Sequence, residues 1–382
     1  MSLGGRSPGE TSPGGSEPSG APARPHDSYI DLVRVTGVLL VVLVHWFLGH
    51  VWWSHHRVGI DSIQLEAPSY WMLTWLMAVP TILFAGGYSN YVLLEERARA
   101  GTPLTAFYVR RFRRLLAPLL LFLAAWVLIE AALHLWGTGG SGPIRGVSAK
   151  GVLPFGSLWF IAVYLMIIVL APGMLWLHAR LGVLCPLALM ASAAAVDGLR
   201  FLVAVPGVGW LNALVVWLVP YQFGYLYADG SLRALPRMAP LCFFLVGIAG
   251  LLLLTSLGNY PRSIGGVTGE RISNVKPPTL CIVALSLWQV GLVLALERRM
   301  RSLLRRPRLA AGVARLNGVT MSMYLWHMTA LLIVLIAVEP LGLAAGSASM
   351  ASWYLQRPVW LALGALVLAA ICRLTKRVDA YR

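Results

Sequence analysis

Acidic side chains are scarce in this chain, and charge of either sign is thinly spread. Among 382 residues there are 15 Asp and Glu against 31 Lys and Arg, and charged residues make up only 12%. Hydrophobic residues make up 58%, and the mean hydropathy is +0.72. A soluble domain of this length needs far more polar surface, so the composition predicts an all-α polytopic membrane protein.

Cysteine is also rare, and the usual motifs of soluble enzymes are missing. The four cysteines all lie within apolar runs and show no CxxC spacing: Cys185, Cys242, Cys281 and Cys372. We interpret them as small core residues and expect neither a disulfide framework nor a metal site. A Gly-rich phosphate loop, HExxH and GxSxG are absent, which gives no support to the soluble nucleotide-binding and hydrolase classes.

The formal net charge of +16 alone would suit a nucleic-acid partner. The basic residues, however, cluster in short connections between apolar runs, as the positive-inside rule describes for membrane proteins. We therefore expect a lipid bilayer as the partner and no nucleic acid.

Apolar stretches of about 20 residues predict about ten spans that enclose a polar cavity. They are expected at 29–50, 69–93, 115–136, 157–177, 182–203, 208–228, 238–257, 278–297, 318–339 and 355–373. Placing the basic connections 94–114 and 298–317 in the cytoplasm puts both termini there, with roughly three quarters of the Lys and Arg. Residues 1–28, rich in Gly, Pro and Ser, are expected to form a disordered cytoplasmic tail before a membrane domain at 29–375. Residues 376–382 are expected to form a C-terminal cytoplasmic tail.

The first span, "DLVRVTGVLLVVLVHW", contains an arginine and a histidine eleven positions apart, Arg34 and His45. Eleven residues turn a helix about 20° beyond three full turns, so both lie on one face, about 16 Å apart along the axis. Asp31, three residues before Arg34, can pair with it. The structural alternative is that Arg34 snorkels to the headgroups and that His45 bonds a neighbouring helix. Ionisable groups on one intramembrane face favour a polar pathway instead.

These two residue types suit a transfer across the membrane. A neutral imidazole takes a proton from an alcohol at physiological pH. A guanidinium at the inner boundary binds the phosphates of a cytosolic ligand.

Several segments in order resemble the membrane acyltransferase-3 family. They are the arginine, ten residues and histidine of the first span, "FAGGYSN" (84–90), "RRFRRLLAPL" (110–119), "SLWFIAVYL" (157–165) and "YLWHMT" (324–329). "SNVKPPTL" (273–280) is similar to a loop of actinobacterial members.

The resemblance implies an integral-membrane O-acyltransferase. It would move an acyl group, acetyl by default, from cytosolic acyl-CoA as co-substrate to a hydroxyl of an envelope polysaccharide or other glycan, a glycolipid or a secondary metabolite. It implies His45 as the catalytic base and Arg34 as its functional companion. The inner (cytoplasmic) membrane of the cell would be its location.

Other candidates have structural alternatives. Arg113 and Arg114, the closest of the basic run to the third span, are candidates for CoA phosphates, while topology and anionic lipid explain such a run equally well. Trp159 and Tyr164 are candidates for an acceptor groove, although aromatic residues in spans usually form the core. Tyr324 and His327 lie one turn apart and either share the cavity of His45 or bond a neighbouring helix.

Two other functions fit the same features. One is a transporter or flippase of a polar lipid or metabolite, which would not consume acyl-CoA. The other is a catalytically silent assembly partner. The acceptor, the acyl length, an acyl-enzyme intermediate and any oligomer are left open by the sequence.

Overall fold

The computed structural model describes residues 27–54, 57–62, 69–137, 155–256, 259–265, 272–338 and 350–379. The predicted N-terminal tail up to residue 26 lies outside these ranges, as do residues 380–382. Residues 138–154 and 266–271, which lie between predicted spans, also fall outside.

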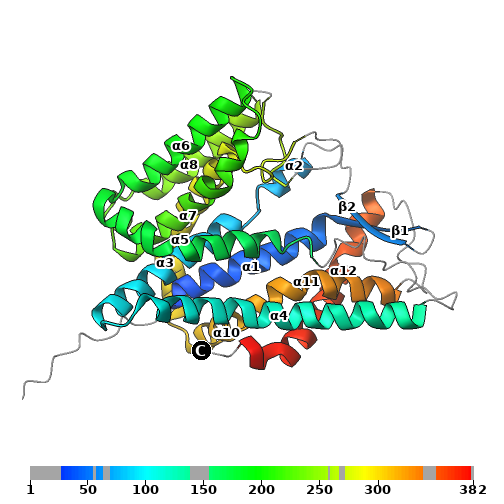
Figure 1. The fold of residues 1–382 in the computed structure, drawn as a ribbon. Helices are drawn as coiled ribbons and strands as arrows, with labels where there is room; N and C mark the ends of the chain where they lie inside the picture. Colours follow the sequence, from blue (N-terminus) through cyan, green and yellow to red (C-terminus); the bar gives the residue numbers. More distant parts are fainter. Residues whose placement is uncertain are drawn as a thin grey trace, which may run out of the picture.

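The described chain is a helical bundle with one short β-hairpin (Figure 1). Its helices are α1 (Ser28–Leu48), α2 (Ser69–Thr74), α3 (Val79–Arg99), α4 (Leu104–Gly137), α5 (Trp159–Leu181), α6 (Leu184–Phe201), η2 (Val208–Leu211), α7 (Asn212–Ala228), α8 (Ala239–Ser256), α9 (Leu280–Leu304), α10 (Pro307–Asn317), α11 (Thr320–Val338) and α12 (Met350–Asp379). Strands β1 (Gly49–Ser54) and β2 (Arg57–Ser62) pair antiparallel directly after α1.

The predicted polytopic class is confirmed. Within the described residues, nine helical segments are long and apolar enough to cross a bilayer. The remaining predicted span, 208–228, is helical too and is formed by η2 and by α7, which has 17 residues. Most side chains of α7 are buried, so this short helix lies inside the bundle.

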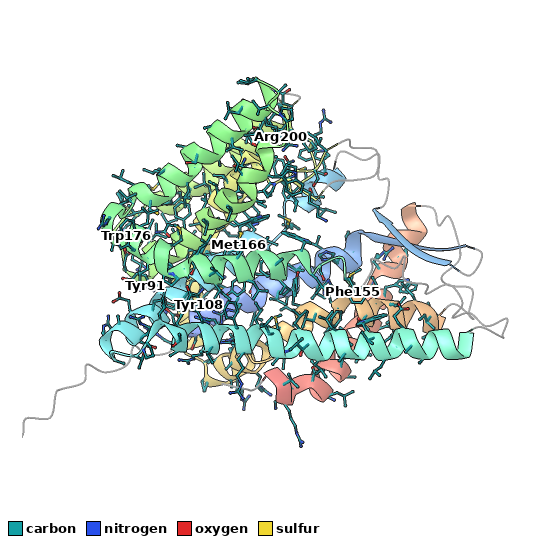
Figure 2. All side chains as sticks on the ribbon, viewed as in Figure 1. Tyr91, Tyr108, Phe155, Met166, Trp176 and Arg200 are labelled. Carbon is teal, nitrogen blue, oxygen red and sulfur yellow. The ribbon has the colours of Figure 1, made fainter. Side chains whose placement is uncertain are left out.

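Helix α1 lies at the centre of the bundle. It contacts α3, α9, α10, α11 and α12. In Figure 1 it runs through the middle of the bundle, below α5 and above α4, while α6, α7 and α8 lie above α5. Figure 2 shows the side chains of the described residues in the same view. Side chains along α1 therefore contact helices from both the N-terminal and the C-terminal half of the sequence.

Helices α3 and α7 approach each other closely at two glycines. A Cβ on Gly87 would lie 2.1 Å from the carbonyl oxygen of Tyr221, and one on Gly224 would lie 2.2 Å from that of Phe84. Any larger residue would push the two backbones apart, so the second glycine of "FAGGYSN", Gly87, is required for this packing.

A polar network ties several helices together at the end of the bundle where α1 begins, which we call the basic end. Arg301 donates to the carboxylate of Asp27 at 2.7 Å and to that of Glu297 at 2.8 Å. Glu297 also accepts from Tyr227 at 2.7 Å and from Arg233 at 3.2 Å. The start of α1 is thereby fixed to α9 and to the connection after α7.

The structure departs from the predicted boundaries in four places. Helix α4 begins at Leu104, eleven residues before the predicted span, and α10 occupies much of the predicted connection 298–317. The predicted span 69–93 is broken between α2 and α3, where α3 restarts with Pro80 in its first turn. The β-hairpin was not expected. Apolar length marks only the part of a helix that lies in hydrocarbon, so basic extensions and breaks escape it.

Candidate active site

Arg34 is held by four acceptors near the basic end. Its Nη1 donates to Asp31 at 3.3 Å, as predicted, and to Oδ1 of Asn317 at 3.1 Å. Its Nη2 donates to the carbonyl of Ala85 at 3.3 Å and to the hydroxyl of Ser89. Only 17% of the Arg34 side chain is exposed. These contacts explain how a guanidinium is held inside the helical bundle, since each buried N–H needs an acceptor.

Two further arginines lie beside Arg34. Arg111 donates from Nη2 to the carbonyl of Ser89 at 2.6 Å, and its Nε is buried without a partner among the described residues. Arg111 and Arg114 are three residues apart on α4 and therefore share a face. Three neighbouring cations repel one another, so a multiply charged anion between them would be bound favourably.

Two cavities meet at these three arginines. The cavity at the basic end has a volume of about 290 Å³, and the inner cavity one of about 110 Å³. The first is lined by polar and charged groups that include Asp27, Asp31, Ser89, Glu96, Arg110 and Asn317. The second is lined mainly by apolar and aromatic side chains: Val38, Ile82, Leu115, Phe160, Ile161, Tyr164, Ile168, Met321 and Tyr324. Together they form a charged mouth followed by an apolar neck.

Tyr324 lies at the far end of the neck. Its hydroxyl donates to the carbonyl of Ser157, which precedes α5. Its ring lies 5.4 Å from the ring of Phe160 and 6.0 Å from that of His327. Tyr324 thus contacts both the neck and the histidine beyond it.

His45 and His327 face each other across α1 and α11. Their ring centroids are 5.0 Å apart, with an interplanar angle of 60°. The Nδ1 of His45 lies 2.7 Å from the carbonyl of Val41, and that of His327 lies 2.6 Å from the carbonyl of Tyr324. A carbonyl only accepts, so each Nδ1 carries the proton and each neutral ring keeps its lone pair on Nε2.

The two histidines differ in access. The His45 side chain is exposed, whereas His327 is 0% exposed, and its Nε2 has no partner among the described residues. Helix α1 therefore carries Arg34 and His45 at two points along one face, as its sequence predicts.

Trp46 fixes the helices around this pair. Its indole Nε1 donates to the carbonyl of His327 at 2.9 Å, and its own carbonyl accepts from Arg357 at 3.3 Å. Its ring lies against Gly364, where an added Cβ would be 2.9 Å away. One side chain thereby joins α1, α11 and α12 beside His45.

The structure brings most of the predicted site residues together. Tyr164 and Tyr324 line the neck, His327 faces His45, and Arg34 and Arg114 line both cavities.

Two predicted residues lie elsewhere. Trp159 packs on Trp217, with ring centroids 5.5 Å apart, and is not among the residues that line the two cavities. Arg113 is exposed on α4 and does not line them either.

Four residues of the site were not singled out from the sequence. Ser89 and Asn317 bind Arg34, Arg111 binds Ser89, and Arg357 binds Trp46 from α12. A signal existed for Arg111, because Arg111 and Arg114 would share a face on a helix. Hydropathy assigns this segment to a connection between spans, which hides the signal. Arg357, an arginine near the end of an apolar run, resembled an ordinary boundary residue.

The fold and the site define a class: a polytopic helical membrane protein with an arginine-lined mouth, an apolar neck and a histidine pair. A protein-family model described as "Acyltransferase domain" matches residues 27–375, nearly the whole chain. The chain belongs to this family, the acyltransferase-3 family, and is a membrane acyltransferase. No curated protein and no solved structure shows a significant match.

Proposed function

We propose that the protein transfers an acyl group, acetyl in the simplest case, from cytosolic acyl-CoA to a hydroxyl of an acceptor reached from the other side of the membrane. The observation that carries this proposal is the order of groups along α1. Arg34 lies at the charged mouth, the apolar neck follows, and His45 lies beyond it.

The donor fits the mouth and the neck by charge and shape. With the basic end in the cytoplasm, as the positive-inside rule favours, the phosphates of CoA would meet Arg34, Arg111 and Arg114. Arg113, exposed on the same helix, is proposed to contact the outer part of the same headgroup. The uncharged pantetheine arm would follow the neck and carry the thioester toward Tyr324.

His45 supplies the base. Its Nδ1–H donates to the carbonyl of Val41, which orients the ring and leaves the Nε2 lone pair for the acceptor hydroxyl. As the hydroxyl oxygen forms a bond to the thioester carbon, its proton passes to Nε2. The C–S bond then breaks, and the proton passes to the departing thiolate, so an ester and free CoA leave.

Direct transfer needs no nucleophile on the protein. The described residues that line the neck include no cysteine, and their one serine or threonine hydroxyl, that of Thr320, donates to the carbonyl of Asn317 at 3.0 Å. The neck is lined by bulky side chains, which supports a short acyl group. A cell-envelope glycan, a glycolipid or a secondary metabolite would supply the hydroxyl. We place the enzyme in the inner membrane of the cell, with both termini in the cytoplasm.

The test uses the purified full-length protein in nanodiscs with radiolabelled acetyl-CoA and a membrane-envelope extract as acceptor. His45→Ala is expected to lower label transfer at least about a hundredfold, the range typical of removing a general base. Leu43→Ala, on an exposed position of the same helix, is the matched control and is expected to keep wild-type transfer. Full transfer by His45→Ala would refute the assignment of the base. A wild-type protein that transports a solute without consuming acetyl-CoA would instead support a transporter.

A further inference from the structure

A third cavity opens at the basic end, between the last turns of α3 and α5 and the start of α4. Its volume of about 680 Å³ is larger than that of the mouth or of the neck. None of the residues that line it lines either of the other two. The proposed acyl transfer therefore makes no use of this cavity.

The guanidinium of Arg97 lines the third cavity. Arg97 is half-buried, and its Nε is buried without a hydrogen-bond partner among the described residues. Two positions further along α3, the exposed Arg99 donates to Glu95 at 3.2 Å and does not line the cavity. A guanidinium fork matches the oxygens of a phosphate, and a bound phosphate would supply the acceptor that Nε lacks.

Most of the remaining wall is apolar. Side chains from three helices form it: Leu94, Ala98, Leu104, Pro172, Leu175, Trp176 and Ala179. The two candidate spans beside the cavity end at Arg99 and Leu181, so the cavity lies where hydrocarbon gives way to headgroups. Trp176, which is 56% exposed, is of the residue type enriched at that depth. Figure 2 shows Trp176 and Tyr91, another lining residue, at the same end of the molecule.

Carboxylates balance the positive charge in the cavity. Glu95 and Asp229 both line it, and Asp229 also accepts from Nε2 of His178 at 2.9 Å. Two carboxylates beside Arg97 disfavour a multiply charged anion such as acyl-CoA. They suit a headgroup that carries an ammonium next to a single phosphate.

We propose that this cavity binds one phospholipid with a zwitterionic headgroup of the phosphatidylethanolamine type. The phosphate pairs with Arg97, and the ammonium donates to Glu95 and Asp229. The acyl chains leave the cavity along Leu104 and Trp176. This site is separate from the proposed acyl transfer and does not depend on it.

Two substitutions test different parts of the site. Arg97→Gln removes the cation. Ala179→Phe places a ring in the cavity and keeps Arg97, and Ala179 is exposed, so the core is not disturbed. Arg237→Gln is the matched control, because Arg237 is exposed in the connection before α8 and lines none of the three cavities.

The experiment is native mass spectrometry of the delipidated full-length protein in detergent, titrated with phosphatidylethanolamine. The readout is the Kd of the first bound lipid, measured on the folded fraction alone. Wild type is expected to bind this lipid more tightly than diacylglycerol with the same chains, glycerophosphoethanolamine or phosphatidylglycerol. Arg97→Gln is expected to raise the Kd roughly tenfold or more, the effect of losing hydrogen bonds to a charged group. Ala179→Phe is expected to raise it similarly, and Arg237→Gln to leave it unchanged.

The opposite results would overturn the site. A wild-type Kd in Arg97→Gln, or an equal loss in Arg237→Gln, would mean that Arg97 holds no particular lipid. A wild-type Kd in Ala179→Phe would place the lipid outside the cavity. Tighter binding of phosphatidylglycerol would contradict the zwitterionic headgroup, and displacement of the lipid by acetyl-CoA would assign the cavity to the donor.

Discussion

Arg34 and Arg111 are joined through a single residue, Ser89. The hydroxyl of Ser89 accepts from Arg34, and its backbone carbonyl accepts from Arg111 at 2.6 Å. The same hydroxyl donates to the carbonyl of Ala85 at 2.8 Å. The spacing between two cations of the mouth is therefore set by one turn of α3.

Ser89→Ala removes the bond to Arg34 and keeps the carbonyl that holds Arg111. Because a hydrogen bond to a charged group is worth about 1.5–3 kcal/mol, we expect KM for acyl-CoA to rise roughly tenfold or more. The kcat is expected to change little, since His45 is not touched. Steady-state kinetics checks this, with the exposed Ser192→Ala as control. A fall in kcat at constant KM would contradict it.

The arginines of α4 are expected to differ in importance. Arg111 and Arg114 line the charged mouth, whereas Arg113, which is exposed like Arg114, does not line it. We expect Arg111→Ala to raise KM for acyl-CoA at least about tenfold, and Arg113→Ala by less than about threefold, because an exposed charge is screened by water and salt. Binding of labelled acetyl-CoA in nanodiscs measures both. A larger effect at Arg113 would restore the sequence-based assignment.

Gly86 controls the width of the neck. An added Cβ would lie 2.9 Å from Cε2 of Tyr164, a side chain that lines the neck and stacks on Phe160. Gly86→Ala is therefore expected to displace the tyrosine ring and to change the relative rates with acetyl-CoA and longer acyl-CoAs. Competition between two donors of different length measures this ratio. Gly86→Ala combined with Tyr164→Phe tests whether the phenol ring is the cause, because the added methyl still meets the ring when the hydroxyl is gone. An unchanged ratio in Gly86→Ala would contradict the assignment.

Gly87 is expected to tolerate no side chain. The clash there is with backbone, the Tyr221 carbonyl 2.1 Å away, so the helices themselves must move. Gly87→Ala is expected to destabilise the protein by more than about 2 kcal/mol, the scale of overpacking in a core. Gly173→Ala, where no atom lies within 4 Å, is the control, and there alanine should gain about 0.5–1 kcal/mol of helix propensity. Thermal unfolding in detergent compares the two.

The sequence predicted the parts of this protein that depend on a single helix. Hydropathy and basic connections located the spans, and the period of the helix placed Arg34 and His45 on one face. Asp31 beside Arg34 followed from the same arithmetic and is confirmed at 3.3 Å.

The contacts that the sequence did not predict join residues on different helices. The partners of Arg34 come from α3 and α10, and His327 reaches His45 from 282 positions along the chain. Pairing between distant helices leaves no trace in the period of either one. Arg111 ranked behind Arg113 and Arg114 for a more local reason: α4 extends past its apolar part, so its basic first turns lie on a helix face rather than in a loop.

The distance between Arg34 and His45 is set by one uninterrupted helix, α1. Each residue added between Arg34 and His45 would turn the histidine by about 100° and move it about 1.5 Å along the axis, so a single insertion would aim the ring at a different neighbour. Insertions in the connections between helices carry no such consequence. In the proposed function, the ten residues between Arg34 and His45 would match the stretch of donor that lies between its phosphates and its reacting carbonyl.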